Sequence, residues 1–232
     1  MVAITLYLIP ASVIASEYDN SSWFVEGRYQ TSFYQGSDWR ENEVDLGGPS
    51  NNIISANSEK RNKVNSSGVA VGYVFANKKI TMSASYEKFA SSVWSSGNYV
   101  SRDGRTFDSA HYPMNMHNFM FETAYRFPID DELHAIGLIG LGQAHVKTDR
   151  YTKSFSGVSG TGSIAEKTVK NLSKRIGVGL SKKLNDKISI VGLMQYTDYG
   201  YAKTRCCVEG FETFDTEVSA AEASIRVRYY FD

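Results

Sequence analysis

The 232-residue sequence has only 4 prolines, only 2 cysteines and no excess of charge of either sign. Lysine and arginine together number 25, as do aspartate and glutamate, so nothing favours nucleic acid as a partner. After residue 15, no apolar run reaches the roughly 18 to 20 residues that a membrane-spanning helix needs. The histidines His111, His117, His134 and His145 lack the spacing of a zinc site. We therefore expect no metal, no cofactor and no helical membrane anchor.

The C-terminal stretch, Ala221 to Phe231, alternates strictly between two kinds of side chain. One parity is apolar and ends in two aromatic residues: Ala221, Ala223, Ile225, Val227, Tyr229 and Phe231. The other parity is polar and mostly charged: Glu222, Ser224, Arg226, Arg228 and Tyr230. A strand sends successive side chains to opposite faces, so this stretch predicts a strand with one apolar face. A half-buried strand of a soluble protein and the last strand of an outer-membrane barrel both fit this pattern.

Seven earlier runs of similar length also read as strands, at 23–34, 66–76, 80–89, 118–127, 133–146, 172–184 and 188–199. The connections between the eight runs are alternately long and short. A soluble sandwich does not sort its loops in this way, whereas a transmembrane barrel has short periplasmic turns and long external loops. We predict an all-β, eight-stranded antiparallel up-and-down transmembrane β-barrel with four long external loops and three short turns. In the run 133–146 both parities are apolar, so its facing stays ambiguous.

Residues 1–16 differ from the rest of the sequence. Val2 to Ile9 form an apolar core, Pro10 interrupts it, and Ala15 and Ser16 offer a cleavage site. This pattern predicts a secretory signal peptide, which leaves residues 17–232 as the barrel domain. The segment has no basic residues at its start, so two alternatives stay open: a true start further upstream, or a buried strand.

In a barrel, the polar parity of each run faces the lumen. Most of these residues are small, but charged residues stand among them: Glu26, Arg28, Glu87, Glu122, Arg126, Arg175, Glu222, Arg226 and Arg228. An eight-stranded barrel is only wide enough for its interior to be filled by side chains. Because burying one unpaired charge there costs on the order of several kcal/mol, we expect acids and bases to pair. The pattern favours a structural plug over an ion path.

The sequence resembles the eight-stranded outer-membrane β-barrel superfamily that includes the opacity proteins and the OmpX/Ail-like adhesins. The residues that carry the resemblance are Ile225–Phe231, the glycine-punctuated Ala135–Gly142 and Arg175–Ser181. The resemblance extends over nearly the whole stretch 22–231. It implies a monomer in the outer membrane of a Gram-negative bacterium, in contact with lipid and lipopolysaccharide, with its long loops extracellular. It also implies that the barrel assembly machinery reads Tyr229 and Phe231, although Asp232 follows here where the family usually ends on its aromatic residue.

The resemblance further implies that the loops carry adhesion or another interaction with a host or cell surface. Aromatic and cationic residues that a barrel does not require stand in these stretches: Trp39, Arg40, Trp94, Tyr99, Arg105, Tyr151, Phe155, Phe211 and Phe214. Such residues are frequent anchors of protein interfaces, and they also occur where a barrel meets the membrane surface. Two other functions stay open: a small-solute, porin-like channel, and an enzyme acting on lipid A or peptide. No pairing of nucleophile and base indicates an enzyme.

The two cysteines, Cys206 and Cys207, are adjacent in the fourth long stretch. Consecutive Cα atoms lie about 3.8 Å apart, which is shorter than the roughly 4.4 to 6.8 Å of ordinary disulfides. We therefore expect free thiols or an intermolecular bridge rather than a disulfide between them.

Overall fold

The computed structural model describes residues 22–45, 48–53, 62–75, 79–96, 99–100, 106–148, 152–155, 158–160, 167–203 and 212–231. The signal peptide predicted over residues 1–16 and the two cysteines lie outside this part of the chain. The strands are β1 (Ser22–Asp45), β2 (Gly48–Ile53), β3 (Asn62–Val74), β4 (Ile80–Phe89), β5 (Ser92–Ser96), β6 (Tyr99–Val100), β7 (Thr106–Pro128), β8 (Leu133–Thr148), β9 (Thr152–Phe155), β10 (Val158–Gly160), β11 (Lys167–Lys183), β12 (Ile188–Lys203) and β13 (Glu212–Phe231). Within the described ranges, no helix is long and apolar enough to cross a membrane.

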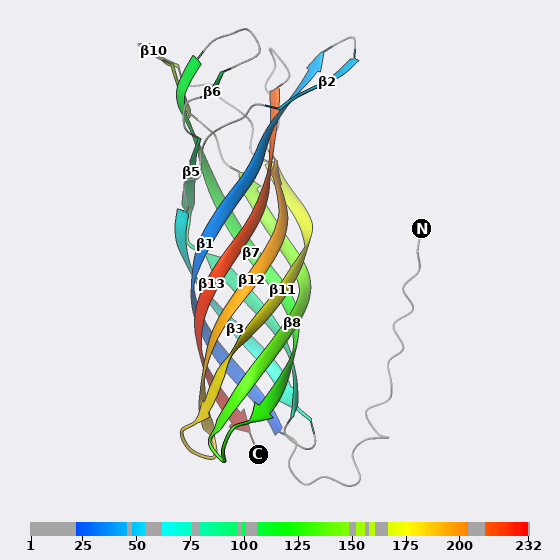
Figure 1. Ribbon diagram of the computed structural model, residues 1–232, viewed down its shortest axis with the longest axis vertical. Helices are drawn as coiled ribbons and strands as arrows, with labels where there is room; N and C mark the ends of the chain where they lie inside the picture. The colour runs from blue at the N-terminus through cyan, green and yellow to red at the C-terminus, as the bar shows by residue number, and fades with distance from the viewer. Residues whose placement is uncertain are drawn as a thin grey trace.

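Eight of the strands close into a barrel, in the order β1, β3, β4, β7, β8, β11, β12, β13 and back to β1 (Figure 1). All of these pairings are antiparallel. A row of paired residues that begins at Trp23 and passes once around the barrel returns to β1 at Phe33. This displacement is the stagger that tilted strands need in order to close. The predicted eight-stranded up-and-down architecture is confirmed.

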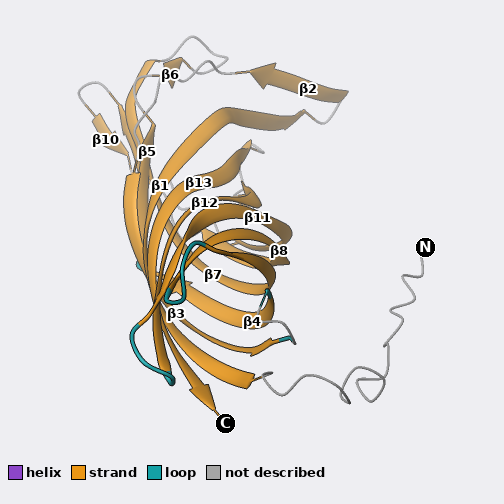
Figure 2. Cartoon of the chain, turned by 60° about the horizontal axis from the view of Figure 1, so that its bottom comes forward, coloured by secondary structure: helices purple, strands orange, loops and turns teal. Residues whose placement is uncertain are grey.

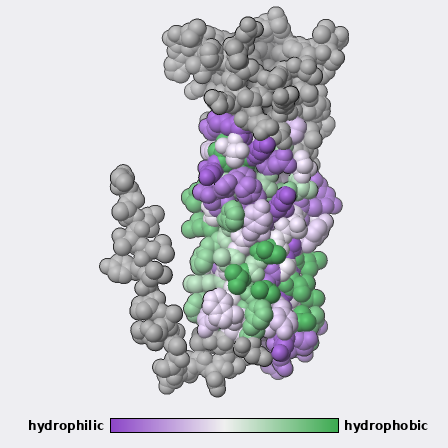
Figure 3. Space-filling view, turned by 180° about the vertical axis from the view of Figure 1, so that it is seen from behind, coloured by the Kyte–Doolittle hydropathy of each residue, from purple (hydrophilic) through white to green (hydrophobic). Residues whose placement is uncertain are grey.

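The side chains alternate between the two sides of the wall as the sequence parity predicts. On β13, Ile225 and Val227 point outward and are 62% and 52% exposed, whereas Arg226 between them is 1% exposed. On the face seen in Figure 3, many outward residues of the middle and lower barrel are apolar and form an apolar zone, and more polar residues lie above them. In transmembrane barrels, lipid covers an outward apolar surface of this kind.

Several strands continue well beyond this apolar zone. The sequence predicts loops over 35–64, from 90 to about 117, over 148–171 and over 200–216, but β1 continues to Asp45 and β7 begins at Thr106. The short strands β2, β5, β6 and β9 pair with these extensions, and β10 pairs with β9 (Figure 1). The polar composition is misleading here because strand pairing uses the backbone, and residues above the lipid need no apolar face.

Two short turns are described in full at the opposite end of the barrel, where β13 also ends (Figure 2). In the turn between β7 and β8, Asp130 Oδ1 accepts hydrogen bonds from the backbone N–H groups of Glu132 (2.9 Å) and Leu133 (2.7 Å). In the turn between β11 and β12, Asn185 Oδ1 accepts from Lys187 (2.9 Å) and Ile188 (2.8 Å). Each side chain satisfies backbone donors that the turn would otherwise leave open.

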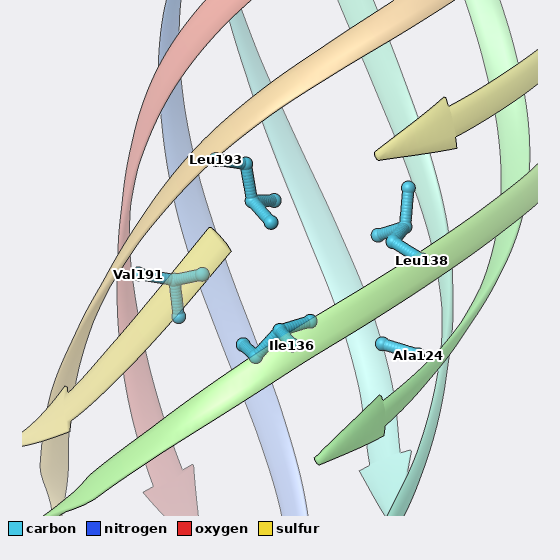
Figure 4. Close-up of a cluster of buried hydrophobic side chains, with 5 residues drawn as sticks. All are labelled: Ala124, Ile136, Leu138, Val191 and Leu193. Atoms are coloured by element: carbon cyan, nitrogen blue, oxygen red, sulfur yellow. The ribbon is translucent and has the colours of Figure 1, made fainter. Parts of the chain in front are cut away.

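The facing of the ambiguous run 133–146 is settled by the register of β8. Ile139 and Leu141 point outward and are 64% and 61% exposed, while Ile136 and Leu138 are buried inside the barrel. The two inward residues pack with Ala124, Val191 and Leu193 in an apolar cluster (Figure 4). The parity of the other runs predicts a lumen lined by polar and small side chains. At this cluster, the lumen is lined by apolar side chains instead.

Candidate functional site: the barrel lumen

The inward residues of β1 show how the lumen changes along the barrel. From the turn end to the loop end they are Phe24, Glu26, Arg28, Gln30, Ser32 and Tyr34, and all of them are buried. An aromatic ring thus stands at each end of this series, with charged and then neutral polar groups between the rings. The same parity on the neighbouring strands supplies the partners of these groups.

Glu122 is held by three arginines from three different strands. Its carboxylate oxygens lie 2.6 Å from Arg28, 2.7 Å from Arg175 and 2.9 Å from Arg226. The four side chains come from β7, β1, β11 and β13, so these contacts bridge the lumen instead of joining neighbours along one strand. All four are at most 5% exposed. Charge-assisted hydrogen bonds of this length are the strongest that side chains form.

The other buried acids extend this cluster. Glu87 accepts from both terminal nitrogens of Arg175, each at 2.7 Å, and lies 3.2 Å from Arg28. Glu26 lies 2.7 Å from both Arg28 and Arg228. The Arg228 guanidinium also stacks on the Phe24 ring, with its carbon 4.1 Å from the ring centroid. Burial of each of these charges without a partner would cost on the order of several kcal/mol. The ion pairs offset this desolvation cost.

Glu222 stands at the loop end of the cluster and is surrounded by neutral donors. It accepts hydrogen bonds from five side chains: Gln30 (3.0 Å), Ser32 (2.9 Å), Gln195 (2.9 Å), Thr197 (2.7 Å) and Tyr199 (2.5 Å). Arg175 lies further away, at 3.5 Å. Sequence reasoning missed these five donors as a group, although each has the lumen-facing parity of its run.

Three aromatic rings cover Glu222 from the loop side. Tyr34, Phe89 and Tyr199 come from β1, β4 and β12, and are 2%, 4% and 0% exposed. Their ring centroids lie 5.4 to 6.4 Å apart, within the range of attractive aromatic pairs. The lumen thus contains an apolar cluster, a charge network and an aromatic layer.

Arg126 is the one predicted lumen residue that stands apart from this network. It is buried inside the barrel, and Tyr230, near the turn end, interacts with it electrostatically. Among the described residues, no acid forms an ion pair with it. The reason is its position: Arg126 lies four residues from Glu122 along β7, and a strand rises by about 3.3 Å per residue.

The loop candidates lie where side chains are not described. The backbones of Trp39, Arg40, Trp94, Tyr99, Phe155 and Phe214 belong to the strand extensions and short strands at the loop end. Arg105, Tyr151 and Phe211 lie outside the described residues. The aromatic residues of the predicted assembly signal, Tyr229 and Phe231, both point outward at the opposite end, and their ring centroids are 5.4 Å apart.

Comparison with known proteins gives the fold a wider context. No protein-family model matches the sequence, and no curated protein matches it. Solved structures do match. Neisserial surface protein A (NspA) is 13% identical with a TM-score of 0.51, and the alignment covers 92% of this chain and 100% of that chain. OprG, an outer membrane protein from Pseudomonas aeruginosa, is 14% identical with a TM-score of 0.50, covering 92% and 97%.

The chain has the fold of the eight-stranded outer-membrane β-barrels. Identities this low establish the fold and nothing about the activity. The contacts inside the barrel must therefore carry any functional argument.

Proposed function

We propose that the protein is a non-conducting outer-membrane barrel that carries external loops for adhesion to a host or neighbouring cell surface. The observation that carries this proposal is the filled lumen. The buried network around Glu122 and the aromatic layer over Glu222 occupy the cross-section that a solute would have to pass. A buried polar network with this many satisfied partners rigidifies the interior of a protein.

The strand extensions give the proposal its second support. β1 has 24 residues and β7 has 23, whereas about 9 to 11 residues span the hydrocarbon layer when a strand is tilted. The described parts of β1 and β7 therefore continue beyond the apolar zone on the loop side. Binding residues commonly stand on loops that a rigid scaffold positions.

The test is a shortened barrel. The last residue pair between β1 and β3 is Tyr34 with Asn62, so residues 35–61 can be replaced by a two-residue turn. Between β4 and β7, where Lys88 pairs with His117, residues 91–114 can be replaced in the same way. We expect a folded, heat-modifiable barrel that no longer adheres to cultured cells or to extracellular-matrix proteins. Unchanged adhesion with the barrel still inserted would refute the assignment.

A second variant keeps the loop length and tests the side chains. In it, Trp39, Arg40, Trp94, Tyr99 and Arg105 are all replaced by alanine. Adhesion should fall as far as it does in the shortened barrel if these residues are the anchors. In planar bilayers, the wild-type protein should show no stable channel, and a steady conductance would favour the porin-like alternative.

A further inference from the structure

A row of basic and imidazole side chains crosses the outer wall of the barrel directly above the apolar zone. Lys88 on β4 pairs with His117 on β7, His117 pairs with His145 on β8, and His145 pairs with Lys170 on β11. All four have the outward parity of their strands, and their Cα positions are direct cross-strand neighbours. With strands about 4.8 Å apart, the row is about 14 Å wide.

The two imidazole rings meet at the middle of this row. The His117 and His145 ring centroids are 4.6 Å apart, and the His145 Nε2 atom lies 2.9 Å from the Gln143 side-chain oxygen. Lys88 acts electrostatically on His117. Where side chains are described on the upper parts of these strands, at 86–91, 113–119, 141–148 and 167–174, the outward residues include no acid.

The adjoining wall, formed by β12 and β13, has mixed charge. It presents Asp198, Lys203 and Glu217; Asp198 pairs in register with Lys174 of β11, and the Glu217 carboxylate accepts a hydrogen bond from Tyr201. The Lys88–His117–His145–Lys170 row therefore occupies one sector of the barrel, next to a wall that also carries acids. Two lysines and two imidazole donors gathered on one sector favour an anionic ligand there.

A groove in the apolar wall lies next to the row. It has a volume of about 590 Å³, and its wall includes Gly27, Val71 and Ala84. No atom lies within 4 Å of the position that a Cβ on Gly27 would take, so the wall is open there. Tyr86 and Phe119 also line the groove, and each stands two residues from the row, next to Lys88 and His117 respectively. The Tyr86 and His117 rings are in contact, with centroids 6.0 Å apart.

We infer that this wall binds one phosphate-bearing, multiply acylated lipid of the leaflet on the loop side, with its headgroup phosphate at the Lys88–His117–His145–Lys170 row and an acyl chain in the Gly27–Ala84 groove. Two independent features carry this inference, since the row selects an anionic headgroup and the groove selects a chain. The arrangement rests on the outer-membrane placement in the proposed function, but not on adhesion by the loops.

The experiment uses the full folded chain in a neutral detergent with purified lipid A as the probe, and native mass spectrometry counts the bound lipid. We expect one tightly bound molecule. Changing Lys88→Gln and Lys170→Gln together should weaken binding by about 30-fold, because each lysine near a lipid surface contributes roughly a factor of five. The matched control is Lys182→Gln, which removes the same charge from an exposed position of β11 near the turn end and should leave binding unchanged.

Filling the groove tests the acyl part separately. Ala84→Phe should weaken binding of lipid A without affecting the folded fraction, because an outward phenylalanine is tolerated in the apolar zone. The deacylated, phosphorylated headgroup should bind equally to wild type and Ala84→Phe. In imidazole NMR spectra, the signals of His117 and His145 should shift on addition of lipid A, while His134 near the other end should not.

Several results would overturn the inference. Equal affinity for lipid A and for zwitterionic phosphatidylcholine would show that the row does not select phosphate. An equal loss from Lys182→Gln would show a general charge effect. These outcomes are independent of the loop-shortening experiment, because the shortened barrel keeps Lys88, His117, His145 and Lys170 and should bind the lipid even if it no longer adheres.

Discussion

Arg28 on β1 lies 2.6 Å from Glu122 on β7, although β3 and β4 stand between these two strands around the barrel. The ion pair therefore crosses the interior instead of following the wall. A chord of this kind fixes the distance between distant strands.

Glu122 should be coupled energetically to Arg226 but not to Arg126. Glu122→Ala removes the acid that three buried arginines share and should lower the free energy of unfolding by about 3 to 5 kcal/mol. Adding Arg226→Ala should restore part of this loss, since Arg226 lies 2.9 Å from Glu122. Adding Arg126→Ala should give a loss equal to the sum of the two single changes, because Arg126 lies four residues from Glu122 along β7 and forms no ion pair with it. Urea titrations of the barrel in detergent measure all the variants, and additivity in both double variants would contradict the network.

The two sides of the wall should respond differently to a charge. Val71, Phe121 and Val227 point outward and are 49%, 54% and 52% exposed. Replacing any of them by arginine should destabilise the inserted barrel by about 2 to 4 kcal/mol near the midplane of the membrane. Ser83→Asn, on the lumen side of β4, serves as the control and should cost less. The inserted fraction in lipid vesicles is the readout, and equal effects on both sides would reverse the assignment of the faces.

Gly142 on β8 and Gly192 on β12 should differ in their tolerance of a methyl group. A Cβ on Gly142 would lie 2.1 Å from the Phe119 carbonyl oxygen, whereas a Cβ on Gly192 would have nothing within 4 Å. Gly142→Ala should therefore destabilise the barrel by about 1 to 3 kcal/mol, the usual cost of overpacking. Gly192→Ala should be neutral or slightly stabilising, because it restricts the unfolded chain. Thermal unfolding of the two variants compares them directly.

The stability that Asp130 gives to its turn should depend on pH, whereas the stability that Asn185 gives to the other turn should not. The pKa of Asp130 is lowered from its ordinary value of 3.8, first by the hydrogen bond from the Leu133 backbone and then by that from Glu132. A lowered folded-state pKa means that the charge stabilises the turn above the unfolded-state pKa, and that this stability is lost as the pH falls through the folded-state pKa. Asp130→Ala should therefore lower the urea midpoint at pH 7, and the deficit should shrink in acid below pH 3.8. Asn185→Ala removes an uncharged cap of the same geometry and should give a deficit that does not change with pH.

The sequence predicts the wall of the barrel better than its ends. Strict alternation at Ile225, Arg226 and Val227 is enough to assign both faces, because the period of a strand is two. It fails where both parities are apolar, as around Ile136 and Leu138, since only the register with the neighbouring strands decides which side is inside. It also fails above the lipid, where polar residues such as Gln35 and Ser37 continue β1 by backbone pairing with β13.

The composition of the lumen was within reach of the sequence, but its connections were not. Parity places Glu122, Arg126 and Arg226 on the same side of the wall. Which acid pairs with which arginine depends on their heights along the barrel axis. These heights depend on the strand registers, which add up to the ten-residue offset between Trp23 and Phe33 on closure. On the outside, the register between β4 and β7 pairs Lys88 with His117, and no local pattern in the sequence predicts that pairing.

The seam between β1 and β13 joins strands from opposite ends of the described chain. Contacts that balance the buried charges lie across this seam: Glu26 accepts from Arg228 at 2.7 Å, and Glu222 accepts from Ser32 at 2.9 Å. An unclosed sheet lacks these contacts and leaves each carboxylate short of donors. These contacts are thus made only when the barrel closes. A partly assembled sheet therefore gains little stability from them until β1 meets β13.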